Sequence, residues 1–186
     1  MRKALLLLAV LSAACGGTTS GVSSAEIQAF NAAALGVSTA AASYGTQAAT
    51  MTSVATCTSA QGAYDPQARP KVVEMQGMGA AMDRSMVSMG SMGHMADDDI
   101  ACAANAMMAE LDRHRSVACA SGTDMTPNKA EAQQHVATMA QWADHQMVRS
   151  NAMGSMMGTG MGGMAGGGIT TGHCVHNPDG SYSMQP

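Results

Sequence analysis

The sequence predicts an all-α protein: an up-down-up-down four-helix bundle followed by a flexible C-terminal tail rich in glycine and methionine. Apolar residues recur every three or four positions in four separate segments, which is the spacing of one face of an α-helix. The connections between these segments are short, so consecutive helices should lie side by side and antiparallel. Because aromatic residues make up only 3% of the chain, alanine and methionine must fill most of the core.

The first helical segment opens with Ser23-Ser24-Ala25-Glu26, whose Ser-x-x-Glu spacing is that of a capping box. Residues 62–70 contain two prolines and a glycine, which favour a loop after this segment. The bundle is therefore expected to span residues 25–152, with its first connection at residues 62–70. The apolar seam of the first segment consists of Ile27, Phe30, Ala34, Val37, Ala41, Tyr44, Ala48, Met51 and Ala55.

The second segment runs from about residue 71 to residue 89. The third begins at Asp97-Asp98-Asp99, where carboxylates favour the positive end of a helix, and ends near Gly122. The fourth has Thr126 as N-cap and Pro127 at its first helical position. The apolar stripes of these segments are Val72, Met75, Met78, Met82, Met86 and Met89; then Ile100, Ala104, Met107, Leu111, His114 and Ala118; then Ala132, His135, Met139 and Trp142.

The first 14 residues have the order of a secretory signal peptide. A basic start precedes an apolar run over residues 4–11, which is much shorter than the ~20 residues that span a bilayer. The end of this region, Leu11-Ser12-Ala13-Ala14-Cys15, resembles a bacterial lipobox, although its leucine stands one position earlier than in the family pattern. The resemblance implies a lipid on Cys15 and a membrane anchor, with residues 15–24 as a tether. Cleavage without lipidation is the alternative.

A lipidated chain would face the periplasm in the bacterial cell envelope. Gly16 stands where inner-membrane lipoproteins of enterobacteria carry a retaining aspartate, which favours the outer membrane. Without the two basic residues of the leader, seven basic residues remain against thirteen acidic ones. This acidic balance argues against nucleic acid as a partner.

Four cysteines remain for disulfides if Cys15 carries a lipid. In the expected topology, Cys57 and Cys119 fall at one end of the bundle. Cys102 falls at the other end, where the fourth helix ends and the tail carries Cys174. The sequence therefore predicts the pairs Cys57–Cys119 and Cys102–Cys174. Metal binding by the thiolates is the alternative.

Methionine is the most unusual feature of the composition, with 20 residues in a chain of 186. One cluster contains Met75, Met78, Met82, Met86, Met89, Met92 and Met95, with His94 inside it. A second contains Met153, Met156, Met157, Met161 and Met164. Thioether sulfur is a soft, neutral ligand that selects ions such as Cu(I). Core packing is the alternative for the first cluster. The second lies in glycine-rich sequence, which is unsuited to a packed helix and favours the metal interpretation.

Histidines add donors of a second kind. His173 and His176 form an H-x-x-H pair in the tail, a spacing suited to copper or zinc. His135 and Met139 lie four residues apart on one helical face, although His135 and His114 are also well placed to be hydrogen-bonded histidines of the bundle. His145, next to Asp144, is expected on the solvent face.

In residues 75–95, 153–164 and 173–176 the chain resembles the periplasmic Met/His-rich copper-binding proteins of bacteria, among them small four-helix bundles. The resemblance is one of composition. It implies binding of Cu(I), and also of silver, for buffering, tolerance or delivery to another copper-handling envelope protein. The implied ligands are the methionines of both clusters with His94, His135, Met139, His173 and His176.

Sequence motifs give no support to an enzyme. A di-iron bundle requires Glu-x-x-His, whereas Glu110 and Glu131 precede His114 and His135 by four residues. No nucleophile elbow, phosphate loop or haem attachment motif is present. Two further alternatives to copper binding remain. One is a structural or interaction lipoprotein whose methionines pack the bundle, and the other is an oxidant sink of surface methionines.

Overall fold

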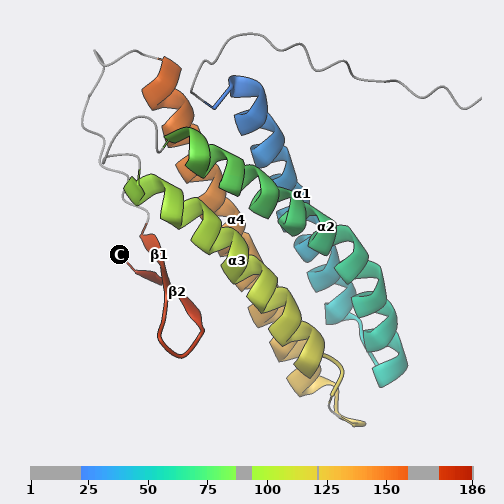
Figure 1. The fold of residues 1–186 in the computed structure, drawn as a ribbon. Helices are drawn as coiled ribbons and strands as arrows, with labels where there is room; N and C mark the ends of the chain where they lie inside the picture. Colours follow the sequence, from blue (N-terminus) through green and yellow to red (C-terminus); the bar gives the residue numbers. More distant parts are fainter. Residues whose placement is uncertain (1–21, 87–93, 121, 159–171, 186) are drawn as a thin grey trace, which may run out of the picture.

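A computed structural model describes residues 22–86, 94–120, 122–158 and 172–185 of the chain. It contains four long helices and a small C-terminal hairpin (Figure 1). The predicted all-α four-helix fold is confirmed, and the strands are an addition to it. The elements are α1 (Ser24–Ala49), α2 (Val54–Met86), α3 (His94–Val117), α4 (Thr126–Gly158), β1 (His173–His176) and β2 (Tyr182–Gln185).

Helices that follow each other in the sequence run in opposite directions (Figure 1). The start of α1 lies beside the end of α4, where Asn31 Nδ2 donates a hydrogen bond to Asn151 Oδ1 over 2.8 Å. The second half of α2 lies beside the first half of α3, where Gln76 Nε2 donates to Asn105 Oδ1 over 2.8 Å. Each helix therefore packs against two others, α1 against α2 and α4, and α3 against α2 and α4.

This arrangement gives the bundle two distinct ends. At one end short connections join α1 to α2 and α3 to α4. At the other end α2 stops at Met86, α3 starts at His94 and α4 stops at Gly158. We call this second end the Met end, because both methionine clusters adjoin it in the sequence.

The capping box predicted for α1 is present. The Ser23 hydroxyl accepts a hydrogen bond from the Glu26 backbone N–H at 3.2 Å, and the Ser23 backbone N–H donates to the Glu26 carboxylate at 2.6 Å. The helix ends at Ala49, and Thr56 Oγ1 accepts hydrogen bonds from the backbone N–H groups of Thr52 and Ser53 at the next helix start. The first connection is therefore at residues 50–53.

The predicted loop at residues 62–70 was wrong, since α2 continues through Pro66 and Pro70. Both prolines are exposed, and the carbonyl groups that they leave without an N–H partner belong to Gly62 and Pro66, which are exposed as well. Tyr64, Ala68 and Val72 lie on the opposite face and are buried in the core. Tertiary packing of this face outweighs the local cost of the prolines.

Other boundaries also differ from prediction. Helix α3 begins at His94 rather than at Asp97, and α4 continues to Gly158, beyond the expected end at residue 152. The predicted tail from residue 153 therefore begins inside α4. It later forms an antiparallel hairpin in which Cys174 pairs with Met184. None of the described helices is long and apolar enough to cross a membrane.

Both predicted disulfides are present, Cys57–Cys119 near the short connections and Cys102–Cys174 between α3 and β1. Cys119 follows α3 with a left-handed backbone (φ 61°), a conformation that commonly ends helices. The second disulfide joins the hairpin to the side of the bundle, where the hairpin packs along α3 (Figure 1).

Candidate functional site

A buried polar network lies in the core of the bundle, in the half nearer the short connections, and is built from one tyrosine of α1, one of α2 and the His/Glu pairs of α3 and α4. We call it the central network because all four helices contribute to it. In its first branch, His114 on α3 lies between two partners. Its Nε2 atom is 3.0 Å from the Tyr44 hydroxyl, and its Nδ1 atom is 3.1 Å from Glu131 Oε1 on α4. The branch thus connects three helices through one imidazole.

The second branch has the same composition with the helices exchanged. His135 on α4 has its Nε2 atom 2.9 Å from the Tyr64 hydroxyl of α2. Its Nδ1 atom is 2.7 Å from Glu110 Oε1 on α3. Each histidine is therefore bonded to the glutamate of the other helix, and not to the one four residues before it in its own.

The two branches are in contact through their rings. The imidazoles of His114 and His135 stack with centroids 3.9 Å apart and planes within 8° of parallel. The phenol rings of Tyr44 and Tyr64 stack with centroids 4.8 Å apart. Arg113 links the two carboxylates, since its Nη2 atom is 2.7 Å from Glu110 Oε1 and 2.6 Å from Glu131 Oε1.

Burial and charge determine which protonation states this network favours. Desolvation, followed by electrostatic repulsion from the neighbouring His135 ring, lowers the pKa of His114 to about 4 despite its bond to Glu131. Burial alone would raise the pKa of Glu110, but hydrogen bonds from Arg113 and His135 bring it down to about 2. At neutral pH the network therefore holds a neutral His114 and an ionised Glu110.

Both phenols are also perturbed. Burial, reinforced by the negative charge of Glu131, raises the pKa of Tyr44 to about 12. Burial and then the charge of Glu110 raise the pKa of Tyr64 as well. The tyrosines are therefore neutral donors. An ionised carboxylate can only accept, so a neutral imidazole carries its proton on Nδ1 and accepts from the phenol at Nε2.

The sequence contained a signal for this network that motif reasoning did not use. Glu110-x-x-x-His114 on α3 and Glu131-x-x-x-His135 on α4 repeat one spacing on two neighbouring helices. Residues four apart share a helical face, so antiparallel helices bring the glutamate of each near the histidine of the other. The repeated spacing indicated a paired site, whereas the tyrosine partners follow only from the packed structure.

A second polar cluster surrounds Asp99, which the sequence suggested as part of a helix start. Asp99 is instead buried, with its side chain 2% exposed. Its Oδ2 atom lies 3.0 Å from His145 Nε2 and 2.6 Å from Arg149 Nε, and Oδ1 accepts the backbone N–H of Cys174. His145 is therefore not on the solvent face, as was predicted, but buried in this cluster.

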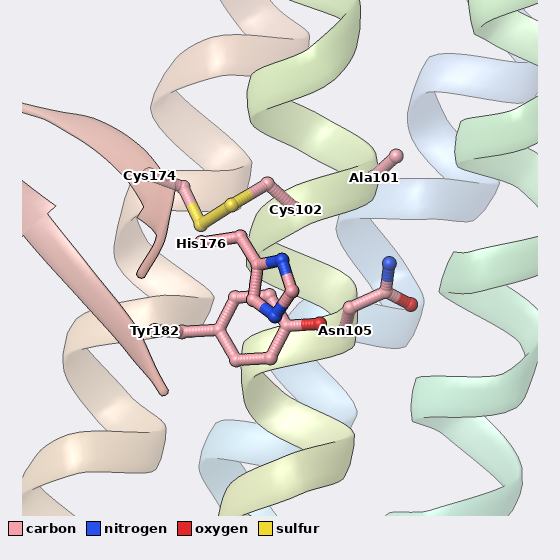
Figure 2. Close-up of a pocket in the computed structure, with 6 residues that line it drawn as sticks. All are labelled: Ala101, Cys102, Asn105, Cys174, His176 and Tyr182. Carbon is pink, nitrogen blue, oxygen red and sulfur yellow. A yellow bond between two sulfur atoms is a disulfide. The ribbon is translucent and has the colours of Figure 1, made fainter. Parts of the chain in front are cut away.

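A surface pocket of about 330 Å³ lies between α3 and the hairpin. It is lined by the Cys102–Cys174 disulfide, Asn105, His176 and Tyr182 (Figure 2). The His176 and Tyr182 rings stack with centroids 4.7 Å apart. The H-x-x-H pair is thereby divided. His176 is held against Tyr182, while His173 begins β1 and is exposed like His176.

A second pocket, of about 260 Å³, lies between α3, α4 and the start of β2. Trp142 and Tyr182 are among its lining residues, and so are Glu110 and Arg113 of the central network. Glu110 therefore belongs to both features. His135 itself is buried, but it is hydrogen-bonded to Glu110, which borders this pocket.

The predicted thioether ligands divide into two groups. Every methionine whose side chain the structure describes is buried or half-buried. This includes Met75, Met78, Met82, Met139 and Met153, which pack in or against the core. The side chains of Met86, Met89, Met92, His94, Met95, Met156, Met157, Met161 and Met164 lie outside the described part of the chain, as does Cys15.

His135 shares a helix with Met139, but both of its ring nitrogens are in hydrogen bonds. Among the described residues, no three His, Cys, Asp or Glu side chains are grouped so as to hold a metal ion.

No protein family, curated protein or solved structure matches this chain.

Proposed function

We propose that this chain is a lipid-anchored envelope protein that binds Cu(I), and also Ag(I), at the Met end of the bundle. The observation that carries the proposal is the common position of two segments far apart in the sequence. One follows Met86 and leads to His94, and the other begins near the end of α4 at Gly158. Both therefore start from the same end of the bundle, and both are rich in methionine.

The proposed ligands are the methionines that the core does not use. Met75, Met82, Met139 and Met153 are buried in apolar surroundings, where their role is packing. The remaining candidates are those in residues 86–95 and 156–164. Two or three thioethers suffice for a low-coordinate cuprous ion, and their neutral sulfurs bind it without a change in protonation.

The hairpin supplies a second kind of donor on the side of the bundle, along α3 (Figure 1). His173 and His176 are exposed, and Cys102–Cys174 fixes their strand to the first half of α3. Imidazole binds copper as well, so each of these histidines adds a separate auxiliary ligand. In this proposal the protein buffers the ion or hands it to another copper-handling envelope protein, and performs no catalysis.

The test is a titration of the purified full-length chain with Cu(I) against a calibrated chromophoric chelator. A variant with Met86, Met89, Met92 and Met95 changed to leucine should lose at least tenfold in affinity, because its thioethers are gone while its apolar volume is kept. A matched control changes the same number of core methionines, Met75, Met82, Met139 and Met153, to leucine. This control should bind copper like the parent. Failure of the parent to compete for copper would refute the proposal.

A second function is favoured by the burial of the described methionines. They fill a core with few aromatic residues, as expected of a structural or interaction lipoprotein. In that case Cu(I) does not bind, and the control variant with four core leucines changes only stability. The titration thus separates the two functions.

A further inference from the structure

We infer that Tyr44 and Tyr64 form a buried redox centre that takes up one oxidising equivalent and passes the phenolic proton to a histidine. The inference is independent of copper binding, since it rests on the central network and not on the Met end. Its basis is geometric. Each phenol donates to an imidazole at 2.9–3.0 Å, and each imidazole is bonded in turn to a carboxylate.

A one-electron outer-sphere oxidant removes an electron from the stacked phenols and is itself reduced by one electron. The O–H bond of Tyr64 or Tyr44 breaks, and its proton forms an N–H bond at Nε2 of His135 or His114. The products are a neutral phenoxyl radical and an imidazolium whose Nδ1–H still faces a glutamate. No charge is left on the phenol oxygen inside the core.

The surroundings favour this proton movement. The network contains two carboxylates and one guanidinium, so its fixed charge is negative and offsets part of the desolvation cost of an imidazolium. Only one of the two stacked imidazoles can become charged without strong repulsion, because their centroids are 3.9 Å apart. The centre therefore takes up one equivalent, and not two.

Two further features suit a radical that persists. Tyr44 and Tyr64 are 1% and 2% exposed, so the radical is shielded from solvent and from coupling with another molecule. Their rings lie 4.8 Å apart, which allows the oxidised state to be shared. Glu110 borders the pocket between α3, α4 and β2, so the proton-accepting chain of Tyr64 ends next to an opening to the surface.

The chain provides its own control residue. It has three tyrosines, and the third, Tyr182, is half-buried on the hairpin and lines both pockets. Tyr182 stacks on His176 and is not one of the phenols of the central network. A tyrosyl radical at Tyr182 should be formed as readily by a strong oxidant and decay faster.

The experiment is laser-flash oxidation of the purified full-length chain by photogenerated ruthenium(III) tris-bipyridine, followed by optical and electron paramagnetic resonance detection of the tyrosyl radical. The parent and Tyr182→Phe should show a radical that lives at least tenfold longer than the one in the Tyr44→Phe/Tyr64→Phe double variant. An equal lifetime in the double variant, or a long-lived signal lost in Tyr182→Phe, would overturn the inference.

A second measurement needs no substitution and so does not depend on how the variants fold. The long-lived radical of the parent should show hyperfine coupling to one exchangeable proton, that of the imidazolium N–H, and the coupling should vanish in D2O. The formation rate should also fall by about twofold or more in D2O. A radical without the exchangeable coupling would place it outside the histidine network and refute the inference.

Discussion

The bundle holds two buried histidine sites that are satisfied in different ways. In the central network both nitrogens of His114 and both nitrogens of His135 have partners. In the polar cluster around Asp99, which we call the outer cluster, His145 is bonded through Nε2 to Asp99. Its Nδ1 atom is buried with no hydrogen-bond partner in the described part of the chain.

The two sites differ in the number of carboxylates that accept hydrogen bonds from the buried groups. The central network has two, Glu110 and Glu131, joined by one arginine that is 41% exposed. The outer cluster depends on one carboxylate, Asp99, for the imidazole, the guanidinium of Arg149 and the backbone N–H of Cys174. The central network can lose one carboxylate contact and keep others. Loss of Asp99 would remove a partner from every group of the outer cluster at once.

The largest effect is therefore expected at Asp99. Asp99→Ala removes the partner of a buried imidazole and of a guanidinium whose side chain is only 16% exposed. Breaking a buried ion pair in this way costs on the order of 3–5 kcal/mol. The free energy of unfolding from chemical denaturation measures the change.

Asp112→Ala is the matched control on the same helix. Asp112 is 63% exposed, and its one ion pair among the described residues is with Arg69. Its loss should therefore change the free energy of unfolding by about 0.5 kcal/mol or less. Equal effects of the two substitutions would contradict the proposed dependence on one carboxylate.

The pH dependence of stability should reveal the central network. The folded pKa of His114 is about 4 and its ordinary value 6.5, so the unfolded chain takes up the proton first as pH falls. Stability should decrease from pH 6.5 to pH 4 by on the order of 3 kcal/mol and then lose this dependence. Glu110, with a folded pKa of about 2 against 4.5, should add a further decrease between pH 4.5 and pH 2.

Denaturant titrations at a series of pH values test this expectation. In His114→Gln the slope between pH 6.5 and pH 4 should be reduced, whatever the stability of the variant at neutral pH. An unchanged slope would show that the neutral imidazole at this position is not responsible.

Among the buried groups, the smallest effect is expected from the phenols. Tyr44→Phe and Tyr64→Phe each remove one hydroxyl from an otherwise unchanged ring stack and leave Nε2 of a histidine unpaired. Each should cost about 1–3 kcal/mol, and the two costs should be similar because the branches have the same composition. Thermal and chemical unfolding of the two variants, with Tyr182→Phe as control, measures this. A cost in one branch only would show that the branches are not equivalent.

The helical fold and the disulfide pairing could be predicted because both depend on patterns that are local or topological. Apolar spacing gave the four segments, and the antiparallel order brought Cys57 near Cys119 and Cys102 near Cys174. The position of the first connection could not be found in this way. Pro66 and Pro70 favour a loop locally, but the buried face between them decides in favour of a helix.

The central network and the outer cluster were largely missed because their partners come from different elements. The contact of His135 with Tyr64 joins positions 71 residues apart, and that of Asp99 with Cys174 joins positions 75 apart. The hairpin had a usable signal. Asn177-Pro178-Asp179-Gly180 is typical turn sequence, and Gly180 adopts a positive φ of 83° there. Whether the Met end binds copper remains a prediction.

The two disulfides have a consequence for the denatured chain. The loops that they close, 57–119 and 102–174, overlap along α3. The shortest covalent route from one terminus to the other therefore runs to Cys57, crosses to Cys119, returns along the α3 sequence to Cys102, and crosses to Cys174. This route contains fewer than half of the 186 residues. When oxidised and fully unfolded, the chain should have a much smaller hydrodynamic radius and end-to-end reach than its length implies.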